Sequence, residues 1–512
     1  MIVLDGATLT PGQVAAVARF GEEVALSDGA RARNAAARRA IETRLERGGA
    51  LYGATTGVGA LRDRTITEAD RERYQWNLLR SHAVSAGRPL TPELVRAGMV
   101  VRANQLGAGG AGVAPELLDG LILALNRQIT PLTREYGSLG TGDLPALAET
   151  ALALLGEGQV WRDGALGPAP PLLNGVRLGL RDALGFMSSN AFTSGYAALL
   201  TVDGLELHDD WLAAAALSFE ALQADPIVLD PRVQAAAGGV GQAVVAARMR
   251  DLLAGAALAP EDPDRLVQDP YPFRVLPQVD GVTSDALVAL EQVVTRECNS
   301  RPENALIEDG EALPNGNFHG AALGAALDGL RSALAQSASL IAARVSSLID
   351  PRMTGLTPFL ADDPGVDSGV MMLEYTAHSA AAEARSLATP MATQAAWASL
   401  GVESHASLAG TAARRTGDAI EAMRLLVASE VVVAVRALRL KRRIPAGAGT
   451  SRLFEIAVQE LPAGLEDRAF GRDVELAQTV LRAFGDADRR ARSSFRQADY
   501  GLSDRPKAAK GR

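Results

Sequence analysis

Apolar residues recur along most of the chain with the spacing of α-helices, and strand-like alternation is scarce. The clearest pattern covers residues 320–350, where apolar positions follow one another at alternating steps of four and three. These positions are Leu323, Leu327, Leu330, Leu334, Ile341 and Leu348, with Ser337 and Arg344 as the polar members. Such a heptad stripe predicts a long helix that packs against other long helices. Pro351 is expected to end this helix, because proline cannot continue it.

Similar periodicity recurs at residues 377–388, 410–440 and 472–496. Four long segments of this kind predict a bundle whose core is built from helices. Aromatic residues make up only 4% of the chain, so alanine and leucine dominate the expected core. The sequence therefore predicts an all-α fold.

The first part of the chain has a different sequence pattern. Short helical patterns alternate there with glycine-rich turns, for example at residues 52–59 and 107–113. We therefore expect a loop-rich N-terminal domain over residues 1–205 and a long-helix bundle over residues 206–500. The polar tail 501–512 is expected to be disordered.

Composition narrows the class of protein. The 512 residues carry a formal net charge of −9, which argues against a nucleic-acid surface. Cys298 is the only cysteine, which excludes an internal disulfide framework and fits a reducing cytosol. The N-terminus lacks the pattern of a signal peptide, and no uninterrupted apolar run reaches the ~18 residues of a membrane span. No two of the five histidines have the close spacing of a ligand pair, so we expect no metal site.

The stretch "GSLGTGDLPAL", residues 137–147, combines glycines with a helix start. Asp143 is placed to cap that helix, and Pro145 falls in its first turn, where a missing N–H costs little. Glycines before a helix also present backbone N–H groups, which makes an anion site possible. No Gly-Lys-Ser/Thr follows, so the stretch is not a P-loop. Taken alone, it is better explained as a structural loop than as an active site.

Five polar or aromatic clusters interrupt otherwise apolar sequence. They are YGATTGVG at 52–59, NLLRSHA at 77–83, QDPYPFRVLPQ at 268–278, NSRPENAL at 299–306 and GNFHG at 316–320. In this order they closely resemble the motifs of histidine, phenylalanine and tyrosine ammonia-lyases, over about residues 9–409. The third and fifth motifs are matched in full. Thr55 stands in place of the family's asparagine, and Ala305 in place of its proline.

The resemblance implies an all-α fold of the fumarase/aspartase kind and elimination of ammonia from an aromatic amino acid to give an arylacrylate. Tyr52 matches the base that removes the β-proton, although a phenol has an ordinary pKa of ~10. Arg274 matches the arginine that binds the substrate carboxylate, which suits its planar guanidinium. The other matched pocket residues are Tyr271, counted among the catalytic candidates, and Gln268, Asn299 and Phe318 as substrate-binding candidates.

Three further matches bear on the substrate. Ser81 and His82 resemble the selectivity pair of histidine lyases, where tyrosine and phenylalanine lyases usually show His-Leu or Phe-Leu. Glu383 matches the glutamate that histidine lyases use near the imidazole. The alternative for each of the three is an ordinary polar residue of a helix, and we favour the functional interpretation over it. Together they favour histidine or another polar aromatic substrate.

The family's electrophile, methylidene-imidazolone (MIO), forms when an internal Ala-Ser-Gly cyclises and loses water, so no external cofactor is needed. This chain has Gly140-Thr141-Gly142 there, and its loop is one residue shorter. Gly142 could still attack the carbonyl of Gly140, but dehydration of Thr141 would give an ethylidene group, whose extra methyl hinders amine attack. We therefore expect an unmodified peptide at 140–142, with a MIO-type ring as the alternative.

Other positions near the expected electrophile also depart from the family pattern. The family's Asn-Gly-Thr has two partial matches, at Asn174 and Asn190, and the distance from the loop favours Asn190. Glu374 replaces the glutamine of Gln-Tyr-Thr-Ala, and the family's Gln-Glu-Asp-His reads VESH at 402–405. Several such changes beside a retained Tyr52 and Arg274 suggest an altered reaction.

Three functional hypotheses remain. The first is an ammonia-lyase-like enzyme that acts on histidine, another aromatic amino acid or an analogue. The second is an enzyme of the same fold that needs no MIO and performs another elimination, addition, isomerisation or cyclisation on a small acid. The third is a non-catalytic homologue that binds a small ligand. Because the family builds its pocket from several subunits, the resemblance also implies a homotetramer formed by the long helices.

Overall fold

The computed structural model describes residues 1–173, 175–258, 268–394 and 396–492. The expected tail, 501–512, lies outside the described residues. The structure is 61% helical and 8% strand, which confirms the predicted all-α class. The chain folds into two compact units. Unit 1 comprises Met1–Gly204, Ala286–Ser332 and Leu387–Asp418, and unit 2 comprises Leu205–Asp285, Ala333–Ser386 and Ala419–Arg512.

This division differs from the linear one that the sequence suggested. The first boundary falls near residue 205 in both schemes, but each unit also takes later stretches of chain. The reason is that four long helices contribute residues to both units: α8 (Ala191–Leu222), α12 (Leu276–Cys298), α13 (Ala321–Ile349) and α16 (Ala409–Leu440).

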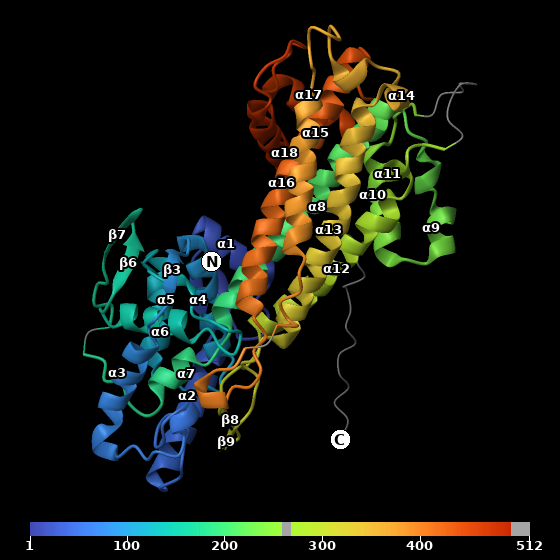
Figure 1. The fold of residues 1–512 in the computed structure, drawn as a ribbon. Helices are drawn as coiled ribbons and strands as arrows, with labels where there is room; N and C mark the ends of the chain where they lie inside the picture. The colour runs from blue at the N-terminus through green and yellow to red at the C-terminus, as the bar shows by residue number, and fades with distance from the viewer. Residues whose placement is uncertain (174, 259–267, 395, 493–512) are drawn as a thin grey trace. The chain divides into compact units, whose positions relative to one another are not determined.

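Unit 1 is built around one buried helix (Figure 1). Thirteen consecutive residues of α4, from Val95 to Gly107, are buried. α4 packs against α1, α2 and α5. The helices confined to this unit are α1 (Pro11–Phe20), α2 (Asp28–Glu46), α3 (Arg71–His82), α4 (Pro92–Gly107), α5 (Pro115–Asn126), α6 (Leu144–Leu154) and α7 (Asp182–Met187).

Short strands join the loops of unit 1, and helical periodicity gave no sign of them. They form small sheets of two or three strands, with β1 parallel to β2 and the other pairs antiparallel. The strands are β1 (Ile2–Leu4), β2 (Val24–Leu26), β3 (Ala86–Pro89), β4 (Thr130–Pro131), β5 (Arg134–Tyr136), β6 (Gln159–Arg162), β7 (Ala165–Pro168), β8 (Leu306–Glu308) and β9 (Glu311–Leu313).

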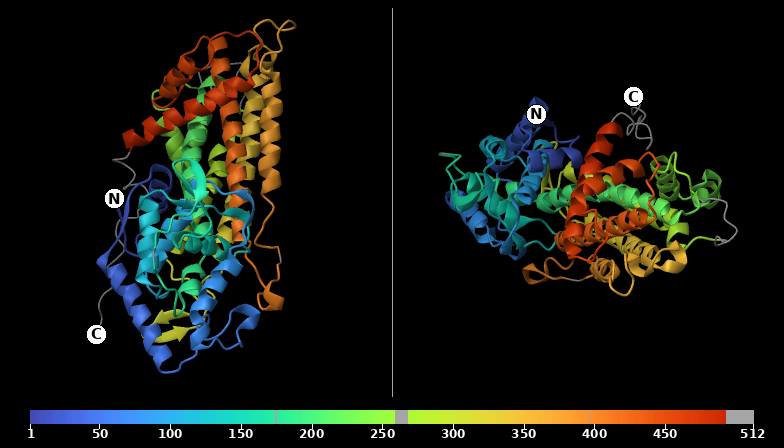
Figure 2. Two further views of the ribbon diagram at one scale, coloured as in Figure 1. Left: turned by 90° about the vertical axis from the view of Figure 1, so that its left-hand side faces the viewer. Right: turned by 90° about the horizontal axis from the view of Figure 1, so that it is seen from above.

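Unit 2 is the helix bundle. Within it, segments of α8, α13, α15 and α16 run side by side, as two further views also show (Figure 2). Arg344 of α13 donates to both carboxylate oxygens of Glu430 on α16, at 2.7 and 3.0 Å, and all of this pair is buried. The remaining helices are α9 (Pro231–Ala237), α10 (Val240–Leu252), α11 (Tyr271–Arg274), α14 (Pro351–Thr354), α15 (Met371–Leu387), α17 (Thr450–Glu460) and α18 (Gly471–Arg492).

The four long helices expected from periodicity are present as α13, α15, α16 and α18. All eight heptad positions of α13, including Ser337 and Arg344, are buried. Among the described helices, α13 alone is long and apolar enough to cross a membrane by composition. However, 61% of its most apolar window is buried inside the protein, as expected of a core helix.

Candidate functional site

Tyr52 lies in a tight turn of unit 1. Its phenol oxygen accepts a hydrogen bond of 2.7 Å from the Gly59 amide. Thr55, the departure from the family's asparagine, closes this turn, because its hydroxyl accepts from the Leu51 amide at 2.8 Å. Gly53 has a φ of +74°, and a Cβ there would lie 2.3 Å from Leu184, so the turn requires glycine. The turn therefore fixes the phenol of Tyr52 against a backbone N–H donor.

Buried charges lie behind the Tyr52 turn. Arg181 donates from Nε to the Tyr52 carbonyl at 3.2 Å, and burial lowers its pKa to about 10. Arg102, also fully buried, pairs with Glu303 at 3.1 Å. Burial raises the pKa of Tyr74, a neighbour of Tyr52, to about 12, so Tyr74 keeps its proton at neutral pH. Of the two tyrosines, Tyr52 is the one with an N–H donor on its oxygen.

The loop at 140–142 is hydrogen-bonded at each residue to distant parts of unit 1. The Gly140 carbonyl accepts from the Gly320 amide at 3.0 Å and from the Ser407 hydroxyl at 2.9 Å. The Gly142 amide donates to Asn190 Oδ1 at 3.0 Å. Gly320, Ser407 and Asn190 all come within two residues of the start of a long helix. The loop therefore lies at the N-terminal ends of α13, α16 and α8, where helix dipoles give a positive potential.

Asp143 occupies the N-cap position of α6, as expected, but its side chain does not cap that helix. Its carboxylate instead accepts from the amide and hydroxyl of Thr193 on α8, at 2.7 and 2.8 Å. Burial raises its pKa, and the bonds from Thr193 oppose that shift. Asp143 thus ties the loop to α8, which the capping pattern did not reveal.

The side chain of Thr141 contacts a residue, Glu403, that the sequence analysis did not name as a site residue. Its hydroxyl donates to Glu403 Oε2 at 2.9 Å. Within VESH, 402–405, Glu403 keeps the residue of the family motif next to two positions that differ from it, and this retained glutamate was the available signal. The segment with Glu403 also meets the Tyr52 turn, since the Ala60 amide donates to Ser399 at 3.3 Å and the Ala398 amide to the Glu403 carbonyl at 3.0 Å.

Asn190 and Phe318 meet at the same loop. Asn190 accepts from Gly142 with one side-chain atom and donates to the Phe318 carbonyl with the other. The structure thus brings together Thr141, Asn190 and Phe318 among the expected site residues. Asn174, the weaker match for the same asparagine, lies outside the described residues.

Two histidines far apart in the sequence also come together here. His319 Nε2 and His405 Nδ1 are 3.0 Å apart. Sequence spacing could not predict this pair, because the residues are separated by 86 positions. The pair joins the segments whose Gly320 and Ser407 bind the Gly140 carbonyl.

Ser81, His82 and Asn299 make hydrogen bonds within unit 1. Ser81 and His82 end α3, and both side chains reach the Leu78 carbonyl, at 3.1 and 2.8 Å. The Asn299 amide pairs with the backbone of Leu9 at 2.9 and 2.8 Å. Their substrate-binding roles stay predictions.

Four expected site residues belong to unit 2. Arg274 lies in α11 with its guanidinium 5.7 Å from the ring centre of Tyr271, which is 66% exposed. Gln268 precedes this helix and is exposed, and Glu383 is exposed on α15. The expected carboxylate clamp is therefore next to an exposed ring on its own unit, and its role also stays a prediction.

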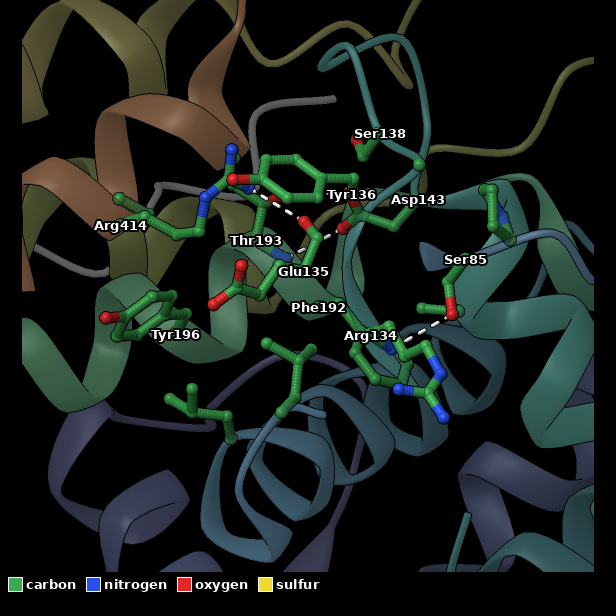
Figure 3. Close-up of a pocket in the computed structure, with 17 residues that line it drawn as sticks. Ser85, Arg134, Glu135, Tyr136, Ser138, Asp143, Phe192, Thr193, Tyr196 and Arg414 are labelled. Carbon is green, nitrogen blue, oxygen red and sulfur yellow. Dashed lines mark hydrogen bonds between the residues drawn. The ribbon is translucent and has the colours of Figure 1, made fainter. Parts of the chain in front are cut away.

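A cavity of about 60 Å³ lies beside the loop in unit 1 (Figure 3). Tyr136, Arg414, Asp143 and Thr193 lie close together in its wall. Its wall includes Ser138 and Asp143, which flank the loop, but not Tyr52, Thr141 or Phe318. Within the described residues, this cavity is therefore distinct from the place where the expected site residues meet.

The surroundings of the tripeptide decide how well it fits a MIO-type ring. A Cβ on Gly140 would lie 2.0 Å from Ser407 Oγ, so the family's alanine has no room here, whereas glycine does. The carbonyl that would be attacked has two donors, and the amide that would attack has an acceptor. Gly140-Thr141-Gly142 therefore fits a ring that lacks the alanine methyl group.

Comparison with known proteins gives a consistent result. The signature of a family described as aromatic amino acid lyase matches residues 9–459. A histidine ammonia-lyase of Geobacillus thermodenitrificans is 36% identical over 503 residues, 96% of this chain and 99% of the relative.

Solved structures with a similar fold include enzymes of the same kind. Ergothionase from Treponema denticola, described as an ergothioneine-degrading enzyme, has a TM-score of 0.90 at 27% identity, over 94% of this chain and 99% of that one. Histidine ammonia-lyase from Trypanosoma cruzi has a TM-score of 0.89 at 27% identity, over 100% and 99%. The chain thus belongs to the aromatic amino acid lyase family and is a carbon–nitrogen lyase.

Proposed function

We propose that this chain removes the α-amine of histidine or a related aromatic amino acid as ammonia and leaves an arylacrylate. The observation that carries the proposal is the Tyr52 phenol, held at 2.7 Å by the Gly59 amide in a turn that contacts the Glu403 segment. Relatives named histidine ammonia-lyase, at 32–37% identity, support histidine as the first substrate to test.

Tyr52 is the proposed base for the β-proton. A donor on the phenol oxygen supports that oxygen when it carries negative charge, and proton transfer by a positioned side chain is worth about 10²–10⁴ in rate. Arg274 is the proposed carboxylate clamp, because guanidinium binds a carboxylate through two parallel hydrogen bonds. Glu403, which touches Thr141, is the proposed polar partner of the substrate beside the loop, and His82 and Glu383 are candidates for contacts to an imidazole.

Gly140-Thr141-Gly142 is the proposed position of the prosthetic group. When formed, the ring supplies an electrophilic double bond for the substrate amine. Asn190, Gly320 and Ser407 would hold it through the Gly142 amide and the Gly140 carbonyl. The short loop and the threonine led us to expect an unmodified peptide from the sequence. These contacts support ring formation, and we therefore propose the ring in place of the unmodified peptide.

The test is turnover of histidine, phenylalanine and tyrosine by the purified chain, followed by ultraviolet absorbance of the acrylate and by release of ammonia. We expect the two products in equal amounts, with histidine the best substrate. Ammonia without acrylate, or no product from any of the three, would reject the proposal.

A second candidate function has its own support. Ergothionase is named for ergothioneine, a betaine whose amine carries three methyl groups. Such a nitrogen has no lone pair to add to an electrophile, and it leaves as a neutral amine without further activation. A chain with an unmodified loop would suit this substrate, and the Glu403 carboxylate would suit its fixed positive charge. Release of trimethylamine from ergothioneine, with no ammonia from histidine, would favour this function over the first.

We also propose that the enzyme is a cytoplasmic homotetramer, with subunits that complete one another's pockets. Cys298 is buried, and burial raises the pKa of its thiol to about 12, so it is unreactive and suits a reducing compartment. Light scattering on the full chain tests the assembly, and a monomer that keeps full activity would contradict it.

A further inference from the structure

The Gly140 carbonyl has an unusual set of neighbours for a loop carbonyl. It accepts from the Gly320 amide at 3.0 Å and from Ser407 Oγ at 2.9 Å, and these donors are far from it in the sequence. Ser407 is 1% exposed. Its hydroxyl oxygen also accepts from the Ala409 amide at 3.3 Å, at the start of α16. Since that contact uses an oxygen lone pair, the hydroxyl proton is directed to Gly140.

The other two groups of the tripeptide also have partners of suitable polarity. The Gly142 N–H donates to Asn190 Oδ1, which orients the nitrogen, and the Thr141 hydroxyl is bound to the Glu403 carboxylate. Ring closure needs donors on the carbonyl, because negative charge develops on its oxygen when the nitrogen attacks. Two donors on such an oxygen are the arrangement of an oxyanion hole.

Packing at Gly140 makes the Ser407 contact specific. Gly140 has a φ of +82°, and a Cβ there would lie 2.0 Å from Ser407 Oγ and 3.0 Å from the Leu408 and Ala409 amides. The Leu408 amide also donates to the Leu139 carbonyl at 2.9 Å. The 407–409 segment therefore occupies the space that a side chain at position 140 would need. The same contact that excludes alanine places the donor on the carbonyl.

We propose that Ser407 is a positioning residue for ring closure within Gly140-Thr141-Gly142, and that with the Gly320 amide it activates the Gly140 carbonyl. This inference rests on the ring-forming version of the proposed function. The Gly142 nitrogen bonds to the Gly140 carbonyl carbon. The carbonyl oxygen leaves as one water with the amide protons of Gly142 and Thr141, and a C=N bond forms between that carbon and the Thr141 nitrogen. Thr141 then loses its α-proton and its hydroxyl as a second water, which leaves an ethylidene-imidazolone. No oxidant or external reactant is needed.

The two water losses can be separated by a substitution at Thr141. In Thr141→Ala the side chain has no hydroxyl to lose, so ring closure alone removes one water. Intact mass of the full chain, followed over time after synthesis, then reports closure by itself. Removal of one donor from an oxyanion hole slows a reaction by about 10²–10³. We expect the wild type to lose two waters, Thr141→Ala one, and Thr141→Ala/Ser407→Ala to close more slowly by that factor.

Matched variants separate activation from general disruption. Ser404→Ala removes an exposed hydroxyl of the same segment. Combined with Thr141→Ala, it should leave the closure rate of Thr141→Ala unchanged. Ser407→Cys keeps the shape of the side chain with a slightly larger atom and is a weaker donor, so it should close at an intermediate rate. It also replaces Ser407→Ala if that variant does not fold, as judged by circular dichroism. Equal closure rates with serine, cysteine and alanine at 407 would overturn the proposal.

Failure of this inference differs from failure of the proposed function. A wild-type chain of unmodified mass overturns the role of Ser407, because no closure occurs. If that same chain releases an amine from histidine or ergothioneine, the lyase function stands without the ring. If the chain loses two waters but releases no amine, the closure rates of the Ser407 variants still decide the role of Ser407, and the lyase function fails.

Discussion

Thr141 and Glu403, 262 positions apart in the sequence, are joined by a hydrogen bond of 2.9 Å between Oγ1 and Oε2. This contact brings the loop at 140–142 to the segment that also meets the Tyr52 turn. It links Thr141, which stands where the family has serine, to a carboxylate on that segment.

The Thr141–Glu403 contact predicts energetic coupling in catalysis. Glu403→Gln and Thr141→Val should each lower kcat/KM, and the double variant should lose less than the sum, because the second change removes a contact already broken. We expect a coupling energy of about 1 kcal/mol, within the usual range for side chains in contact. Thr141→Ser, which keeps the hydroxyl, is the control. Additive losses in this double-mutant cycle would show that the contact has no role.

The packing of Gly140 predicts a stability effect. Gly140→Ala should lower the free energy of unfolding by about 2–4 kcal/mol, because it combines a strained φ with a Cβ 2.0 Å from Ser407 Oγ. Gly48→Ala is the matched control: Gly48 has a φ of +70° with open space around it, so only the strain remains. Denaturant unfolding compares the two. Equal losses would mean that Ser407 does not confine position 140.

Asp210 predicts a pH dependence of stability in unit 2. Burial raises its pKa to about 8, although Arg489 lies nearby. Because the folded pKa exceeds the unfolded one, the stabilising contribution is complete below about pH 4 and is lost as the pH rises through about 8.

The neutral variant Asp210→Asn removes this titration. Between pH 6 and 8, the wild type should therefore lose on the order of 2 kcal/mol relative to Asp210→Asn. Thermal or denaturant unfolding of both proteins at several pH values measures the difference. A difference that stays constant, or that moves in favour of the wild type as the pH rises, would contradict the assignment.

Substitution of Arg274 is expected to weaken binding of the substrate carboxylate. Arg274→Lys keeps the positive charge but loses the planar pair of donors, so it should raise KM by about 10–100-fold with a smaller change in kcat. Tyr271→Phe keeps the ring that faces the guanidinium and serves as a comparison for packing. The amide analogue of the substrate should bind both the wild type and Arg274→Lys equally weakly. A KM unchanged by Arg274→Lys would place the carboxylate elsewhere.

The helical framework could be predicted from the sequence because it depends on local periodicity. The heptad positions of α13 are buried where the spacing placed them, and the motif at 316–320 contains Phe318, whose carbonyl accepts from Asn190 beside the loop. Boundaries between compact units could not be predicted in the same way. A heptad continues unchanged where α13 passes from one unit to the other.

The contacts of the candidate site depend on tertiary structure, and for that reason the motifs did not reveal them. Ser407 to Gly140 and His319 to His405 join positions that no local pattern relates. Asp143 shows the same limit: its residue type and position predicted a helix cap, but another partner, Thr193, was available in space. Short strands such as β4, with two residues, are also set by their partners.

The most direct test of the lyase function compares the wild type with Tyr52→Phe in one experiment that quantifies both the released amine and the acrylate. The change removes only the phenol oxygen, which accepts from the Gly59 amide. We predict equal amounts of the two products from the wild type and a kcat lowered by about 10²–10⁴ in Tyr52→Phe, with an unchanged circular dichroism spectrum. Tyr52→Phe turning over at the wild-type rate would contradict the assignment of Tyr52 as the base.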